Sequence, residues 1–364
     1  MVKVVFDNKN AVFLKSINEA TDKYFANKRF AKTGNIRLYS KTIILIGAAI
    51  SSYLLVLFSH SSLTVNILLG LLLGLISACI GFNVMHDANH GSYSSKKWIN
   101  NTLGLTLNAL GANSFIWKHK HNILHHTYPN VDGMDDDIAK SPYMRMCETQ
   151  PWKPIHRFQH LYVPVLYALS SLIWVLYQDY EKYFKPKLNG VAIKSKMAPS
   201  DHVLFWLSKI LYVAFYIVIP IMMIGWKQWL CFFIALHIGL GFTLAIIFQL
   251  AHVVETTEFE EALPGETKKI ETEWAIHQLQ TTSNFSPSSP VLSWLLGGLN
   301  YQVEHHLYPR ISHIHYPALS KIIKEKCKEF NVPYHSIPTL GQAINSHFRL
   351  IKELGKKPTS LVAR

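Results

Sequence analysis

The sequence has few charged residues and few cysteines. Charged side chains make up 16% of its 364 residues, whereas hydrophobic side chains make up 49%. This balance excludes an intrinsically disordered protein, which needs the opposite composition. The four cysteines lie far apart and form no Cys-x-x-Cys pair. Their spacing argues against a disulfide scaffold and a cysteine-ligated zinc module, so we expect reduced thiols.

Several catalytic motifs are also missing. The chain contains no His-Glu-x-x-His, the signature of zincin proteases, and no Glu-x-x-His, which carboxylate-bridged di-iron bundles use. It also lacks a Gly-x-Ser-x-Gly nucleophile elbow and a glycine-rich phosphate loop. The formal net charge is +13, but the basic residues lie beside long uncharged stretches. This pattern favours a membrane surface, and no nucleic-acid partner is expected.

Two long stretches lack charge almost completely. Residues 42–86 contain no Asp, Glu, Lys or Arg over 45 consecutive positions. A membrane-spanning helix needs about 20 apolar residues, so this stretch predicts two spans joined by a turn near His60–Thr64. The segments 210–226 and 228–254 predict a second pair of spans. The sequence therefore predicts four transmembrane helices in two hairpins.

Lysine and arginine predict which side of the membrane each segment faces. Nine of them lie in the first 41 residues, and further groups occupy 181–196 and 321–328. By the positive-inside rule, these segments and both termini face the cytoplasm. The N-terminal segment is too polar for a cleavable signal peptide. We thus expect a basic arm (1–41), a membrane domain (42–317) and a basic tail (318–364).

Two shorter apolar segments, 98–117 and 161–178, are interpreted as helices that lie in or dip into the cytoplasmic interface. The first contains four asparagines and the second contains Pro164, features that do not suit lipid contact. The alternative that both segments cross the membrane stays open. The expected fold is an all-α integral membrane protein with interfacial helices and a cytoplasmic, histidine-rich cap.

Histidine is unusually abundant, with 19 copies. Histidines at positions i and i+4 lie on one face of a helix, close enough to share a metal ion. Eight imidazoles exceed the four ligands of a structural zinc ion, and imidazole suits iron, zinc and copper, so we expect two metal ions. The histidines lie in three clusters plus one further position: His86 and His90; His121, His125 and His126; His305 and His306; and His252.

These clusters resemble the three histidine boxes of the membrane fatty acid desaturase family. Residues 86–90 match the first box and residues 121–126 match the second. Gln302-Val303-Glu304-His305-His306 matches the third box in the form of the front-end branch, in which glutamine replaces the leading histidine. The resemblance extends from about Lys41 to Pro317, and it implies that the eight histidines bind a di-iron centre.

The resemblance also implies roles for polar neighbours of the boxes. Residues 248–252 resemble the front-end branch, whereas animal stearoyl-type enzymes place a water-holding asparagine where this chain has Phe248. Gln249 or Gln302 is expected to take the role that this asparagine has in the stearoyl-type enzymes. Other candidates for weak ligands or for hydrogen-bond partners of the ligands are Asp87, Asn89, Thr281, Thr282, Asn284 and Asn300. Asp135, Asp136 and Asp137 either orient imidazoles or form a solvated turn.

Some histidines are expected to have no part in the metal site. His119 and His277 are excluded as ligands, with His119 expected at a solvated surface. His313 and His315 follow the third box and are expected to pack or hydrogen-bond near it.

The implied activity is oxygen-dependent desaturation of a long acyl chain that is linked to CoA or to a lipid. The front-end form implies a cis double bond between an existing one and the carboxyl end. The chain lacks His-Pro-Gly-Gly, the haem-binding motif of a fused cytochrome b5 domain. Electrons are then expected from a separate carrier such as a ferredoxin or a cytochrome b5 type protein. The alternatives are a di-iron hydroxylase or ketolase of alkyl chains, and a histidine-rich metal transporter.

Overall fold

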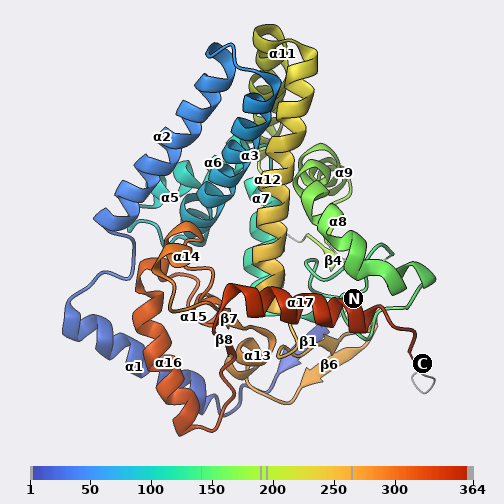
Figure 1. Ribbon diagram of the computed structural model, residues 1–364. Coiled ribbons are helices and arrows are strands. Elements are labelled where there is room, and N and C mark those ends of the chain that lie inside the picture. Colours follow the sequence, from blue (N-terminus) through green and yellow to red (C-terminus); the bar gives the residue numbers. More distant parts are fainter. Residues whose placement is uncertain (1–2, 141, 189–190, 194–195, 264, 359–364) are drawn as a thin grey trace.

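The structure of the protein, a computed structural model, is mostly helical (Figure 1). The structure describes residues 3–140, 142–188, 191–193, 196–263 and 265–358. Five helical runs are long and apolar enough to cross a membrane, one more than the four spans expected. They are Ile36–Phe58, Leu63–His90, Pro154–Phe184, Pro199–Ile224 and Trp226–His252.

The first predicted hairpin consists of α2 (Ile36–Phe58) and α3 (Leu63–Ile80). Both helices begin at side-chain caps, because Asn35 accepts a hydrogen bond from the backbone N–H of Arg37 and Ser62 accepts one from Val65. The connecting turn, residues 59–62, lies at the place that the sequence predicts. A helix of 23 residues such as α2 is about 35 Å long, enough for a bilayer core.

The second predicted hairpin pairs α12 (Trp226–His252) with α10 (Pro199–Val213) and α11 (Ile219–Ile224), which a π-helical turn (Ala214–Val218) connects. Helix α12 occupies the centre of the molecule beside α3 (Figure 1). Glycines let these two helices approach closely. A Cβ at Gly74 would overlap the Leu236 carbonyl oxygen, and one at Gly239 would lie 2.7 Å from the Leu71 carbonyl oxygen.

The two ambiguous segments fold differently from one another. Residues 98–117 form three short helices, α5 (Lys97–Gly104), α6 (Thr106–Ala109) and α7 (Ser114–Lys118), each too short to span a bilayer. Residues 161–178 lie within a longer helical run, the fifth candidate span. That run comprises a 3₁₀ turn (Pro154–Phe158), α8 (Gln159–Ile173), a π-helical turn (Trp174–Gln178) and α9 (Asp179–Phe184).

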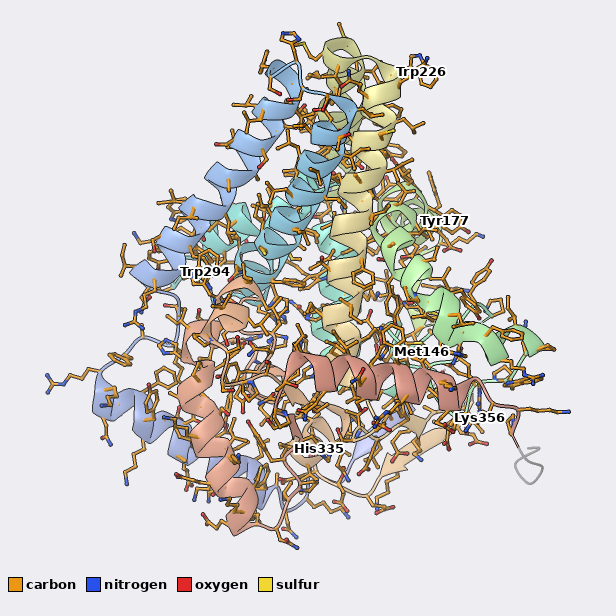
Figure 2. The ribbon with its side chains drawn as sticks, viewed as in Figure 1. Met146, Tyr177, Trp226, Trp294, His335 and Lys356 are labelled. Atoms are coloured by element: carbon orange, nitrogen blue, oxygen red, sulfur yellow. The ribbon has the colours of Figure 1, made fainter. Side chains whose placement is uncertain are left out.

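The remaining helices and the strands form a cap at one end of the molecule (Figure 1). The helices of the cap are α1 (Val12–Lys28), α13 (Trp274–Thr281), α14 (Pro290–Leu295), α15 (Gln302–Leu307), α16 (Tyr316–Glu329) and α17 (Leu340–Leu354). In Figure 2, Trp226 at the tip of the second hairpin lies at the opposite end from His335 and Lys356 in the cap.

Small sheets correct the expectation of an all-α protein. Strand β1 (Lys3–Phe6) pairs in parallel with β6 (Thr267–Ile270), β2 (Val131–Asp132) with β5 (Glu260–Glu261), and β7 (Asn284–Phe285) with β8 (Ser336–Ile337). The antiparallel pair β3 (Lys187–Leu188) and β4 (Val191–Ala192) precedes α10. Most of these strands have two residues, too few to produce a readable alternation in the sequence.

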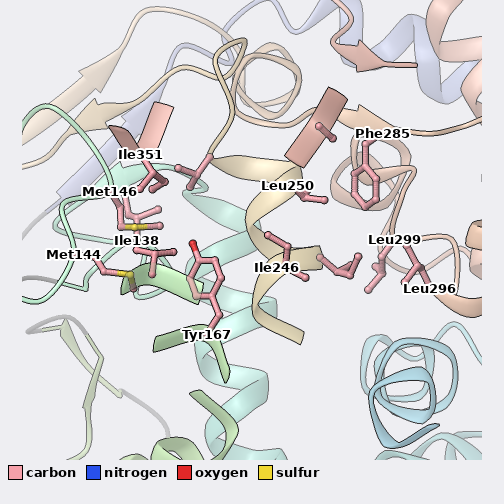
Figure 3. Packing of buried hydrophobic residues seen from close by; sticks show 14 of the residues in the cluster. Ile138, Met144, Met146, Tyr167, Ile246, Leu250, Phe285, Leu296, Leu299 and Ile351 are labelled. Carbon is pink, nitrogen blue, oxygen red and sulfur yellow. The ribbon is translucent and has the colours of Figure 1, made fainter. Parts of the chain in front are cut away.

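A hydrophobic core joins the cap to the helices (Figure 3). Ile246 and Leu250 of α12 belong to the same buried cluster as Tyr167 of α8 and Ile351 of α17. Phe285 of the cap packs into this cluster from the other side of α12 (Figure 3). The end of α12 that carries Ile246 and Leu250 is therefore fixed against α8 and against two segments of the cap.

Candidate metal centre

Eight histidines from distant segments meet where the helices join the cap. His86 and His90 lie on α4 (His86–His90), which continues α3, and His252 is the last residue of α12. The second cluster lies on a π-helical turn (His119–His125) and the residue after it, and the third lies on α15. Seven of the eight side chains are buried, and His90 is partly buried. The structure thus brings together all eight histidines that the sequence singles out.

The ligand atoms form two main groups, each compact enough to hold one metal ion. One group contains His86, His90, His121 and His305, and the other contains His125, His252 and His306. Within each group, the nitrogen atoms lie within 4.8 Å of one another. A third combination joins His121 and His125 to the Asp137 carboxylate. The two main groups match the expectation of two metal ions.

His126 lies between the two groups. Its ring centroid is 4.6 Å from that of His305 in the first group and 4.5 Å from that of His306 in the second. Its Nε2 is 3.2 Å from Nε2 of His121. The eighth predicted ligand is therefore positioned to serve either ion.

Unpaired nitrogen atoms indicate that these residues fit metal ions. Nε2 of His90, His125 and His305 and Nδ1 of His126 are buried without a hydrogen-bond partner. Leaving a buried polar atom unpaired costs about 1–3 kcal/mol, and a coordinated ion would remove that cost. In addition, Nε2 of His86 lies 3.2 Å from Nε2 of His121, the kind of approach that a shared ion produces.

The opposite ring nitrogens of four ligands have fixed partners. Nδ1 of His125 lies 3.1 Å from Asp135 Oδ2, and Nδ1 of His306 lies 3.0 Å from Gln278 Oε1. The other two contacts are His252 Nδ1 to the Thr281 carbonyl oxygen (3.2 Å) and His305 Nδ1 to Tyr316 Oη (3.1 Å). An acceptor at Nδ1 keeps the proton there and leaves the Nε2 lone pair for the metal.

Burial sets the charge of the imidazoles. It lowers the pKa of His121, His126, His305 and His306 well below the ordinary value, and neighbouring imidazoles add to the effect. These ligands are therefore neutral at pH 7, the form that binds metal. Burial acts on the pKa of His125 in the same direction, but the Asp135 carboxylate outweighs it and raises the pKa.

Two π-helical turns adjoin the histidine boxes. One, Gly81–Met85, directly precedes His86, and the other contains His121 and His125. A π-helical turn inserts an extra residue and is frequent at functional sites. The rings of His121 and His125 still stack, with centroids 5.2 Å apart. The i,i+4 spacing therefore predicts the shared face, although the backbone is wider than an α-helix.

The three aspartates after the second box have separate roles. Asp135 binds His125 and also accepts a hydrogen bond from the backbone N–H of Asn130. Burial would raise the pKa of Asp136, but Lys120 and Lys182 outweigh it and hold that pKa below its usual range. The segment is thus a set of buried and partly buried ion pairs beside the histidines, not a solvated turn.

Some of the polar candidates lie beside the histidines, and others form hydrogen bonds elsewhere in the protein. Gln249 is buried one turn before His252, and its Oε1 has no hydrogen-bond partner. Gln302 is also buried, at the start of α15. Asn284 donates to Glu304 Oε2 and accepts from the backbone N–H of Val303.

Four candidates form hydrogen bonds with other parts of the protein. Asp87 accepts from Ser312 Oγ, and Asn89 donates to the Gly104 carbonyl oxygen. Asn300 donates to Ser286 and Ser293. Thr282 donates to the carbonyl oxygen of Gln278, the residue whose side chain contacts His306.

The histidines excluded as ligands lie outside the cluster. His119 is half-buried and contacts Phe115, which corrects the expectation of a solvated side chain. His277 is buried and contacts the Pro129 carbonyl oxygen. His313 contacts Asp87, a residue of the first box, and Lys41, and His315 contacts the Thr33 carbonyl oxygen.

The sequence does not single out Gln278 and Tyr316, which contact His306 and His305. Gln278 lies 28 residues before its partner, and neither residue belongs to a histidine box. No spacing rule connects them with the ligands. Only the fold places them there.

Comparison with known proteins agrees with the geometry. The fatty acid desaturase family matches residues 62–338. An sn-1 linoleoyl-lipid 6-desaturase of Synechocystis is 38% identical over 94% of this chain and 96% of its own length. A second protein of that name, from Arthrospira platensis, is 34% identical over 98% of this chain and 96% of its own length. An acyl-lipid (8-3)-desaturase of Physcomitrium patens is 34% identical over 96% of this chain and 73% of its own. The chain belongs to the fatty acid desaturase family, and it is a desaturase enzyme.

Proposed function

We propose that the protein introduces a cis double bond into a lipid-linked acyl chain, between an existing double bond and the carboxyl end. The observation that carries the proposal is the pair of compact histidine groups at the junction of the helices and the cap. The resemblance of Gln302-Val303-Glu304-His305-His306 to the front-end third box supports the position, near carbon five or six. The relatives named as linoleoyl-lipid 6-desaturases support the lipid-linked substrate.

The two histidine groups would hold two iron ions. His86, His90, His121 and His305 would bind one ion, and His125, His252 and His306 would bind the other, with His126 available to either. Bound iron would supply the capacity to reduce O₂ and to remove two hydrogen atoms from the acyl chain. Asp135, Gln278 and Tyr316 hold the rings of their histidine partners in place.

The group of His125, His252 and His306 offers only three nitrogen ligands, so its ion would need a further ligand. Gln249 is the better candidate, because its buried Oε1 has no hydrogen-bond partner and it lies three residues before His252 on α12. Phe248 packs against His121 and His125, with ring centroids 5.5 and 6.0 Å away. Its apolar ring excludes the water-holding role that asparagine has in the animal stearoyl-type enzymes.

Apolar side chains beside the first group would position the acyl chain. The Trp117 ring stacks on the His121 ring, with centroids 4.4 Å apart. Trp117 belongs to a buried cluster with Met85, Leu107 and Ala112, against which Trp174 packs. These side chains exclude water, and they would bind a methylene chain through the hydrophobic effect. A chain held here presents its carbon atoms next to the imidazoles of the first group.

The metal centre would face the cytoplasm, with the two hairpins as the membrane anchors. The helical run Pro154–Phe184 would lie at the interface, because the cap holds both of its ends. His156 lies 2.8 Å from the Pro142 carbonyl oxygen, and Lys182 Nζ lies 2.7 Å from Asp136 Oδ2. Only six positions separate Asp136 from Pro142, which supports a run that returns the chain to the side from which it came. Four spans then leave all histidines on one side.

Lipid analysis of a host that makes linoleoyl lipids and expresses the chain tests the function. The expected product is a triply unsaturated chain with its new double bond near carbon five or six, located by mass spectrometry after derivatisation. A His306→Ala variant serves as the inactive control. New double bonds formed only at the middle of saturated chains would contradict the front-end proposal. A hydroxylated or oxo product would favour the hydroxylase or ketolase alternative.

A further inference from the structure

A basic hollow lies on the surface of the cap, next to the third histidine box. It has a volume of about 290 Å³, and Lys324, Lys328, Val332 and Tyr334 line it. Both lysines are exposed, and the Lys324 ammonium lies 6.0 Å from the centre of the Tyr334 ring. The hollow therefore combines two exposed lysine ammonium groups with a partly exposed aromatic floor.

The surroundings of the hollow are also basic. Helix α16 carries Lys321, Lys324, Lys326 and Lys328 against Glu325 and Glu329, and Lys326 pairs with Glu329. Helix α1 packs beside α16 (Figure 1), with Phe13 and Phe330 in edge contact at 5.6 Å. Residues 1–41, which include α1, contain nine basic and three acidic side chains. An acidic macromolecule is the partner that such a surface attracts.

A short chain of contacts connects the hollow with the candidate metal centre. Tyr334 Oη donates a 2.8 Å hydrogen bond to Glu304 Oε1, and Glu304 directly precedes His305. Asn284 joins the same carboxylate and fixes the backbone of Val303, also in α15. One side chain, Tyr334, thus separates the surface from the helix that carries two ligands.

The chemistry of desaturation requires electrons from outside the substrate. Reduction of one O₂ to two water molecules consumes four electrons and four protons. Conversion of –CH₂–CH₂– into –CH=CH– supplies two electrons and two protons. The remaining two electrons come from a reduced carrier and the remaining two protons from solvent.

We infer that the hollow formed by Lys324, Lys328 and Tyr334 is the docking site of a small, acidic, one-electron carrier protein, which delivers these two electrons in two successive encounters. The inference rests on the proposed function. An anionic lipid surface is the competing occupant of a basic patch. The hollow lies toward the end of α16 that is remote from the hairpin tips (Figure 1), so a protein fits this location better than a membrane does.

The test compares two double variants with the same change in charge. Lys324→Glu/Lys328→Glu reverses the charge of the hollow. Lys352→Glu/Lys356→Glu reverses the charge of two exposed lysines near the end of α17, on another side of the cap (Figure 2). The probe is a chemically reduced plant-type [2Fe–2S] ferredoxin, added to the full chain in nanodiscs of neutral lipid. The measurements are the KM of desaturation for ferredoxin and, separately, the Kd of oxidised ferredoxin.

We expect the hollow variant to raise both the KM and the Kd for ferredoxin at least tenfold, with the main effect on KM and not on kcat. The α17 variant should change neither constant more than twofold. Equal effects of the two variants, or none from the hollow variant, would overturn the docking site. A hollow variant altered only in its binding to anionic vesicles would assign the patch to lipid and also overturn it. If the wild type desaturates nothing, the proposed function fails, and the Kd comparison still decides the docking site.

Discussion

Nε2 of His252 lies 3.2 Å from Nε2 of His306, although 54 residues separate them in the sequence. One atom belongs to the last residue of the central helix α12, and the other belongs to a short helix of the cap. This contact joins the helices to the cap at the metal centre. Two neutral imidazoles gain little by such an approach, whereas a shared metal ion explains it.

Replacement of His306 by alanine should abolish desaturation and lower the iron content, because it removes one of the three proposed ligands in its group. The variant should still fold into the membrane, since the apolar helices do not depend on the metal. The matched control is His335→Ala, a half-buried histidine outside both groups. Equal iron content and activity in the two variants would show that His306 is not a ligand.

Gln278 should act by orienting His306. Its Oε1 lies 3.0 Å from His306 Nδ1, and loss of such a partner typically lowers metal affinity or activity 10–100-fold. We expect this loss in Gln278→Leu. Gln278→Glu keeps an acceptor at the same place and should retain most of the iron. Iron affinity, measured by competition with a chelator, checks both variants. Similar affinities for the Leu and Glu variants would contradict the orienting role.

Substitution of Gln302 by histidine should lower activity. An amide is a weaker ligand than an imidazole, so we propose that one ion keeps an open or water-filled position, which a histidine at position 302 would close. Activity is measured at equal iron content, which separates this effect from metal loss. Gln302→Asn keeps the amide and serves as the control. A histidine variant as active as the parent would refute the ligand argument.

Glu304 should make the stability of the protein depend on pH. Burial raises its pKa to about 7, although Asn284 and Tyr334 donate hydrogen bonds to it. A carboxyl whose pKa is higher in the folded state binds more protons there. Its stabilising contribution is therefore complete below about pH 4.5 and is lost as the pH rises through about 7. The total change is on the order of 3 kcal/mol.

The matched variant for this prediction is Glu304→Gln, which does not titrate. The difference in unfolding free energy, wild type minus variant, should fall between about pH 4.5 and 7. Thermal unfolding of the iron-free protein over this range measures it. Parallel pH profiles for the two proteins would show that Glu304 does not titrate in this window.

The sequence predicts the spans and the ligand clusters because both depend on local patterns. The uncharged stretch of residues 42–86 predicts the first hairpin, and its turn lies where expected. The i,i+4 spacing of His86 and His90 predicts their shared face, and their ring centroids lie 4.7 Å apart. Local spacing survives folding, so it can be read directly.

Features that depend on distant segments could not be predicted. The π-helical turn before His86 has no marker in the composition of residues 81–85. The parallel pairing of β1 with β6 joins strands more than 260 residues apart. The contact of Tyr316 with His305 arises because the chain folds back between α15 and α16. Each requires the tertiary structure.

The iron content of the purified protein tests the central claim most directly. Two histidine groups, each with ligand atoms within 4.8 Å, should hold about two iron ions per chain. Metal analysis of protein that is expressed with sufficient iron and purified without chelator gives this ratio. A value near two that falls in the His306→Ala variant is the predicted result. A value near zero, or a content of zinc that leaves no place for iron, would contradict the account.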